Sequence, residues 1–140
     1  MDSAERASPA RGRPRPARDQ RGSAVVDFVL VLAVLLPLFV GIVQVALVLH
    51  VRNTLTSAAS EGARHAAAYD RDLADGAART REEISRAVAA SYAEDVRAEA
   101  HSVNGQPGVR VTVVATVPAL GLGGPGIELR VHGHAVEETP

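Results

Sequence analysis

The chain has 140 residues, a formal net charge of -1, no cysteine, no tryptophan and no lysine. Without cysteine it can form neither disulfides nor thiolate metal sites. One apolar run and an Arg/Pro-rich tail leave roughly 90 residues for a folded domain, close to the size at which a single hydrophobic core is marginal. With only two Phe and two Tyr, that core must be built from Val, Leu, Ile and Ala.

Residues 1–22 form a basic tail in which Pro9, Pro14 and Pro16 are scattered among arginines. The tail has almost no large apolar side chains to bury, so we expect it to be disordered. Arginine-rich tails also bind nucleic acid. A cytoplasmic regulator with such a tail is therefore one alternative, but the segment lacks interleaved aromatic residues and adjoins an apolar run. We expect no nucleic-acid partner.

Residues 23–49 predict a single transmembrane helix. Between Ala24 and Leu49 only Asp27 and Gln44 are strongly polar, and the segment is about 39 Å long as a helix. The hydrocarbon core of a bilayer is about 30 Å thick. A cleaved secretory signal is the main rival, but its apolar region is only about 7 to 15 residues long. We therefore expect a single pass through membrane lipid.

Arginine placement predicts the orientation of this helix. Five arginines lie shortly before the span, namely Arg11, Arg13, Arg15, Arg18 and Arg21, whereas only Arg52 and Arg64 follow soon after it. By the positive-inside rule the N-terminus stays cytoplasmic. Residues 50–140 then form an extracytoplasmic domain on the cytoplasmic (inner) membrane. Pro37 removes a hydrogen bond in mid-span, which predicts a kink, although such residues are also simply tolerated in membrane helices.

The sequence after the span predicts two helical segments. An Ala-rich stretch extends the membrane helix to about Tyr69. Residues 70–76 are polar and predict a loop. Thr80 and Glu83 then form a capping-box pattern, which predicts a second helix over residues 81–92.

The remaining sequence predicts three antiparallel strands. Apolar and polar residues alternate over residues 96–102 and 109–114, with Asn104 and Gly105 in the turn between them, which is a hairpin signal. A third strand, residues 127–136, follows a Gly/Pro-rich loop. That loop has the letters of a dinucleotide fingerprint but leads into a strand rather than a helix, so we interpret it as a loop only. The expected fold class is α+β, a three-stranded antiparallel sheet packed by the second helix.

The polar residues do not indicate catalysis. His132 and His134 share one face of the expected third strand, but no third metal ligand has a suitable spacing. The paired acids Glu82-Glu83 and Glu94-Asp95 are typical of solvated faces, and no Ser, His and acid set stands out. We therefore expect no enzyme activity, cofactor, metal or small-molecule ligand.

The start of the apolar run resembles the processing region of type IV pilin-like proteins. It reads Gly22-Ser23-Ala24-Val25-Val26-Asp27-Phe28. In those proteins a prepilin peptidase cuts after the glycine, and an acid followed by Phe stands at the fifth mature position. The resemblance implies cleavage between Gly22 and Ser23, and makes Asp27 and Phe28 the acid and the aromatic residue.

More specifically, the chain resembles the TadE-like family of pilus assembly proteins. The resemblance rests on the basic leader, the acid-Phe pair, an internal Leu36-Pro37, and a small-residue helix containing Ser60, Glu61, Gly62, Ala63 and Arg64. The family usually has Glu where this chain has Asp27. The resemblance implies a pilin-like fold and a non-enzymatic minor pilin, pseudopilin or assembly component of a Tad-type (tight adherence) secretion system. Its partners would be other pilus subunits and a prepilin peptidase. The alternative is a single-span, membrane-anchored protein-binding module with an uncut leader and no pilus role.

Overall fold

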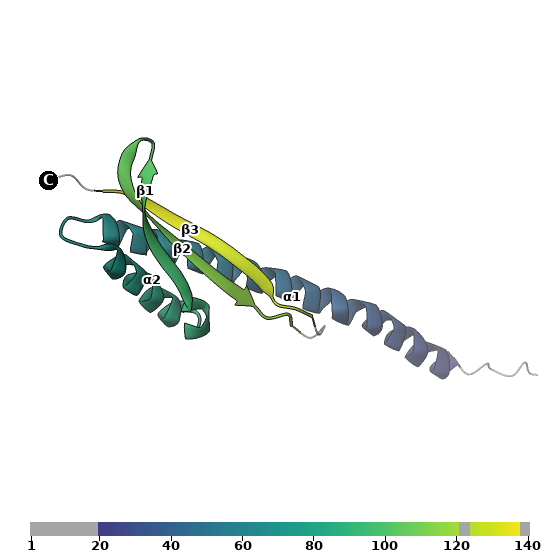
Figure 1. Ribbon diagram of the computed structural model, residues 1–140. Helices are drawn as coiled ribbons and strands as arrows, with labels where there is room; N and C mark the ends of the chain where they lie inside the picture. The colour runs from purple at the N-terminus through teal and green to yellow at the C-terminus, as the bar shows by residue number, and fades with distance from the viewer. Residues whose placement is uncertain (1–19, 121–123, 138–140) are drawn as a thin grey trace, which may run out of the picture. The chain divides into compact units, whose positions relative to one another are not determined.

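The computed structural model describes residues 20–120 and 124–137. Its elements, shown in Figure 1, are helix α1 (Gln20–Ala67), helix α2 (Leu73–Ala87), the 3-10 helix η1 (Ala90–Ala93), and strands β1 (Asp95–Val103), β2 (Gln106–Val117) and β3 (Ile127–Val136). The strands form one antiparallel sheet in the order β1-β2-β3. This architecture confirms the expected α+β class. The chain divides after Pro37 into two units, and we call residues 38–137 the α+β unit.

The first unit contains the N-terminal part of α1. The helix is continuous through Pro37, and every side chain described from Gly22 to Pro37 is exposed. Large apolar residues such as Phe28 and Leu36 bury little of their surface, 66% and 58% of which is exposed. Among the described residues, α1 is the one helix long and apolar enough to cross a membrane. Most of the expected leader, residues 1–19, lies outside the described residues, and residues 20–22 are the first of α1.

Helix α2 begins eight residues before the sequence pattern placed it. Its N-cap is Asp72, whose Oδ1 accepts from the Asp75 backbone N–H at 2.8 Å, while Asp75 Oδ2 accepts from the Asp72 N–H at 3.4 Å. The second helix and the loop before it are thus confirmed, but the expected bounds of both were wrong: residues 73–76 already belong to α2, and α2 ends at Ala87 rather than at residue 92. Asp is a stronger N-cap than Thr, so the earlier capping box starts the helix and the pattern at Thr80 falls inside it.

The turn between β1 and β2 is set by two residues. Asn104 has φ 52 and Gly105 has φ 81, and Val103 pairs directly with Gln106. Positive φ at both central residues defines the type I′ hairpin turn, for which Asn-Gly is a preferred sequence. The hairpin prediction is thus confirmed, but β2 begins at Gln106 and not at Val109. Strand β3 has the bounds that the sequence predicted.

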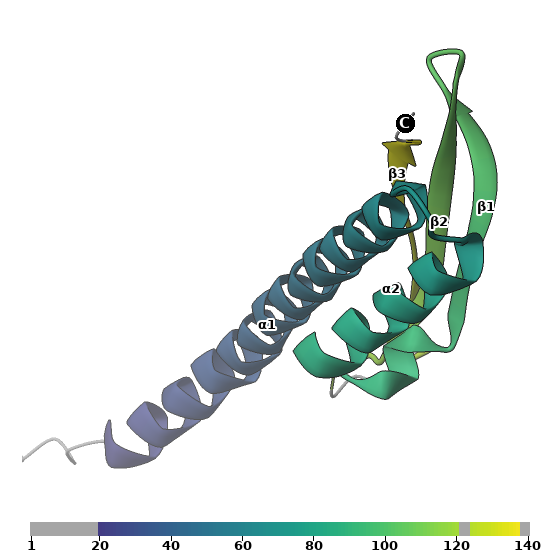
Figure 2. The ribbon, with the colours of Figure 1, turned by 90° about the vertical axis from the view of Figure 1, so that its left-hand side faces the viewer.

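One face of the sheet carries the core of the α+β unit. The buried apolar residues alternate along β2 and β3, and β1 adds one more: Val96, Val109, Val111, Val113, Ala115, Val117, Leu129 and Val131. Against them pack Val51, Leu55, Ala58, Ala59, Ala63 and Ala66 from α1 and Ala77 and Ile84 from α2. Figure 2 shows α2 beside the C-terminal part of α1, both on this face. The core is aliphatic, as the composition required, and the other face of the sheet is left open.

Candidate functional site

The four residues expected at the cleavage site lie in the first turns of α1. Gly22, Ser23, Asp27 and Phe28 are all helical and exposed. A side chain placed on Gly22 would meet nothing within 4 Å. Ser23 and Asp27 are four residues apart, so they lie on the same face of the helix, one turn from each other. The segment is therefore an accessible helix start with an acid one turn inside it.

The expected family segment lies where α1 crosses α2. A Cβ on Gly62 would lie 2.6 Å from the Gly76 carbonyl oxygen and would overlap the Thr80 hydroxyl. A Cβ on Gly76 would lie 2.7 Å from the Gly62 carbonyl oxygen and 2.5 Å from Ala66 Cβ. The two helix backbones thus touch at this point. Only residues without a side chain allow so close an approach.

Thr80 completes this helix crossing. It is fully buried, and its hydroxyl lies 2.9 Å from the Gly76 carbonyl oxygen and 3.4 Å from that of Ala58, to which it can donate. A buried hydroxyl without a partner would destabilise the fold, so these two acceptors explain why a polar residue is tolerated here. The residue that the sequence suggested as a helix cap instead links α2 to α1.

The same stretch of α1 is equally close to the sheet. A Cβ on Gly133 of β3 would overlap backbone atoms of Ala59 and Ser60. Ala59 and Ala63 are completely buried. Helix α1 is therefore held between α2 on one side and β3 on the other. Close packing of the α1 backbone against both α2 and β3 therefore explains why this segment consists of small residues.

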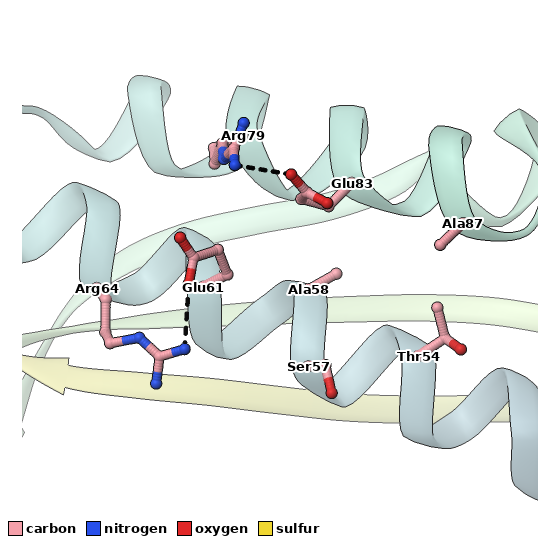
Figure 3. Close-up of a pocket in the computed structure, with 8 residues that line it drawn as sticks. All are labelled: Thr54, Ser57, Ala58, Glu61, Arg64, Arg79, Glu83 and Ala87. Atoms are coloured by element: carbon pink, nitrogen blue, oxygen red, sulfur yellow. Dashed lines mark hydrogen bonds and ion pairs between the residues drawn. The ribbon is translucent and has the colours of Figure 1, made fainter.

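Glu61 and Arg64 face outward from this segment. They form an ion pair of 3.1 Å in which both side chains remain largely exposed. With Arg79 and Glu83 of α2, which pair at 2.8 Å, they line an open groove of about 400 Å³ between the helices (Figure 3). Each pair joins residues of one helix, and exposed pairs of this kind contribute little to stability.

The groove offers no catalytic arrangement among its lining residues. These are Thr54, Ser57, Ala58, Glu61, Arg64, Arg79, Glu83 and Ala87. The Thr54 hydroxyl donates to the His50 carbonyl oxygen at 3.0 Å, and the charged groups are paired along their helices. A nucleophile hydrogen-bonded to a general base, which covalent catalysis requires, is not formed by these eight residues.

The two histidines of β3 lie on the open face of the sheet. His132 and His134 are exposed, and His134 is opposite Arg110 of β2, which in turn contacts His101 of β1. Within residues 20–120 and 124–137, no group of three or more side chains is arranged to hold a metal ion. This face is a mixed-charge surface.

The sequence reasoning missed a role for Gln44. We noted it only as a polar residue within the span, whereas its side chain bonds to the chain after β2: Nε2 donates to the Pro118 carbonyl oxygen at 3.2 Å, and the Leu120 N–H donates to Oε1 at 2.7 Å. A signal was present, because an amide within an apolar run needs hydrogen-bond partners. The partner could not be read from the sequence.

The chain has an exposed apolar helix that fits a single membrane pass. It also has a small antiparallel sheet covered by helices on one face. These two features are those of single-pass, pilin-like α+β proteins. Residues 22–64 match the family model TadE, described as TadE-like protein. The resemblance found in the sequence is thereby confirmed over this segment. The match ends at Arg64, so α2 and the sheet lie outside it. Neither the curated proteins nor the solved structures give a match.

Proposed function

We propose that the protein is a non-enzymatic minor pilin or pseudopilin, or an assembly component, of a Tad-type pilus secretion system. The observation that carries the proposal is the TadE-like match over residues 22–64. This one match contains the pilin-like start at Gly22 and the small-residue segment at Gly62, both within helix α1. The exposure of the apolar side chains of α1 supports insertion into membrane lipid or packing against other pilus subunits.

The proposed topology follows the arginine distribution. Residues 1–22 would be the cytoplasmic leader, residues 23–49 the membrane segment and residues 50–140 the extracytoplasmic domain of an inner-membrane protein. A prepilin peptidase acting from the cytoplasmic side would then meet Gly22 at the membrane surface. The exposed, helical placement of Gly22 and Ser23 supports this access.

Cleavage after Gly22 would leave a free amine on Ser23. In an apolar setting, an isolated amine or an isolated carboxylate is costly to bury, and pairing the two offsets part of that cost. We propose that Asp27 of one subunit pairs with the Ser23 amine of a neighbour and so fixes the register between their helices. The position of Asp27 on the helix face of Ser23 supports this arrangement.

We expect the protein recovered from membranes of cells with their native prepilin peptidase to begin at Ser23. Intact mass and N-terminal sequencing would measure this directly. A Gly22→Val variant is the matched control, since the space around Gly22 accepts a side chain, and it should keep its leader. An intact leader in the unmodified protein would contradict pilin-like processing and favour the membrane-anchored binding module.

We expect Asp27→Ala to insert and be processed normally but to abolish piliation, because the amine of the neighbouring subunit loses its acid. Pilus number by electron microscopy would measure the effect, with membrane level and N-terminal sequence as checks on insertion and cleavage. Asp27→Glu is the matched control, since it keeps the charge, and it should retain piliation. Normal piliation by a processed Asp27→Ala protein would refute the register role.

A further inference from the structure

The Gln44 side chain ties α1 to a segment far away in the sequence. Both ends of its amide are used: Nε2 donates to the Pro118 carbonyl oxygen at 3.2 Å, and Oε1 accepts from the Leu120 N–H at 2.7 Å. Pro118 and Leu120 lie directly after β2, in the connection that leads to β3. In Figure 1 this end of β2 lies beside α1. Gln44 therefore fixes the β2–β3 connection at one level of the helix.

That level coincides with the expected edge of the bilayer. A helix from Ser23 to Gln44 is about 32 Å long, whereas the hydrocarbon core is about 30 Å thick. The exposed apolar side chains continue one turn further, at Val45 and Leu49, and His50 follows. The segment from Gln44 to His50 therefore falls in the interfacial layer between hydrocarbon and water.

The composition of the connection fits the same layer. The sequence has no charged residue between Arg110 and Glu128. On either side of residues 121–123, which are not described, Leu120 is 38% exposed and Ile127 is 42% exposed. The opposite end of the sheet is polar, with Ser102, Asn104 and Gln106 exposed around the β1–β2 turn. The connection between β2 and β3 is thus uncharged, and it is the connection that Gln44 holds against α1.

We propose that the described ends of the β2–β3 connection, residues 118–120 and 124–127, form a second membrane-contacting element that lies in the lipid interface. The partner is the bilayer, because this element continues the lipid-facing surface of α1 at the same level. Irregular backbone cannot enter the hydrocarbon, where its polar groups would lack partners, so the contact is shallow. The hydrogen bonds to Gln44 have two effects. They give the polar amide of Gln44 its partners, and they hold residues 118–120 against α1. The inference depends on membrane anchoring and not on a pilus role.

The absence of tryptophan from the chain allows a direct test. The full-length Leu120→Trp protein would be reconstituted in vesicles of phosphatidylcholine and phosphatidylglycerol that contain nitroxide-labelled lipids. We expect a nitroxide at a shallow acyl position to remove most of the tryptophan fluorescence, and one near the acyl terminus to have little effect. Gln106→Trp, at the far end of β2, is the matched control and should stay unquenched. Phe39→Trp, on the exposed surface of α1 and about 7.5 Å along the helix from Gln44 toward the bilayer centre, should be quenched by both labels.

Two results would overturn the proposal. An unquenched Leu120→Trp with red-shifted emission would place the loop in water, and an unquenched, blue-shifted one would place it against protein. If Leu120→Trp does not fold, Gly124→Trp gives the same readout, because a side chain there meets nothing within 4 Å. Adding Gln44→Ala should reduce the quenching of Leu120→Trp. Unchanged quenching would show that Gln44 does not hold the β2–β3 connection in the lipid interface. Failure of Phe39→Trp to be quenched would instead contradict membrane anchoring itself.

Discussion

Replacing Gly133 by alanine is expected to lower the free energy of unfolding of the α+β unit by about 3 kcal/mol, near the upper end for overpacking a core. The added Cβ would overlap backbone atoms of Ala59 and Ser60. A side chain could move aside, but the backbone of α1 is fixed by its own hydrogen bonds and by α2 behind it. The helix must therefore lift from β3, and the completely buried Ala59 and Ala63 lose contact with the sheet.

Thermal unfolding of the full-length protein in detergent micelles, followed by circular dichroism, would measure this effect. For a unit of this size each kcal/mol corresponds to about 4 to 8 °C in Tm, so a large decrease is expected. Gly124→Ala is the matched control, because its added Cβ meets nothing within 4 Å, and it should leave Tm almost unchanged. Equal Tm values for the two variants would show that α1 does not pack on β3 at Gly133.

The elements with strong local signals were predictable. Alternation of apolar residues and the Asn104-Gly105 turn determined the hairpin, because side-chain period and positive φ act within a few residues. The long apolar run likewise predicted the exposed N-terminal part of α1. The predicted start of α2 was wrong although the signal is local, because two capping-box patterns compete in this stretch and Asp72 is the stronger N-cap.

The contacts that assemble these elements were not predictable from one sequence. Gly133 meets Ala59, and Gln44 meets Leu120, across more than 70 residues of chain. Nothing local marks such a pair, since a glycine in a strand or a glutamine in an apolar run has several explanations. The same holds for Gly62, whose partner Gly76 was expected to lie in a loop. The pilin-like pattern at Gly22 and Asp27 was readable because its spacing is short and fixed.

The structure separates the residues of the family segment by what they contact. Gly62 and Ala63 are buried between elements of the α+β unit, whereas Glu61 and Arg64 form an exposed ion pair. The sequence presented these four as one motif. Gly62 and Ala63 stabilise the fold by allowing close packing, whereas the exposed side chains of Glu61 and Arg64 are free to contact another molecule.

Replacing Gly62 by alanine is expected to lower the free energy of unfolding by about 2 kcal/mol, because overpacking costs more than the roughly 1 kcal/mol that alanine gains over glycine within a helix. The Cβ would lie 2.6 Å from the Gly76 carbonyl oxygen and would overlap the Thr80 hydroxyl. Rotation of Thr80 would relieve only the second contact, and it would break the hydrogen bonds of that buried hydroxyl to α1 and α2.

The same melting experiment with three further variants separates folding from binding. Gly41→Ala, in the same helix but with open space around it, should not lower Tm. Glu61→Ala and Arg64→Ala should change Tm little, since an exposed pair contributes about 0 to 1 kcal/mol. A Gly62→Ala protein as stable as the Gly41→Ala protein would contradict the backbone contact between α1 and α2. If Glu61→Ala and Arg64→Ala melt, insert and are processed like the unmodified protein but reduce piliation, that result would favour a contact of these side chains with another subunit under the proposed pilus role.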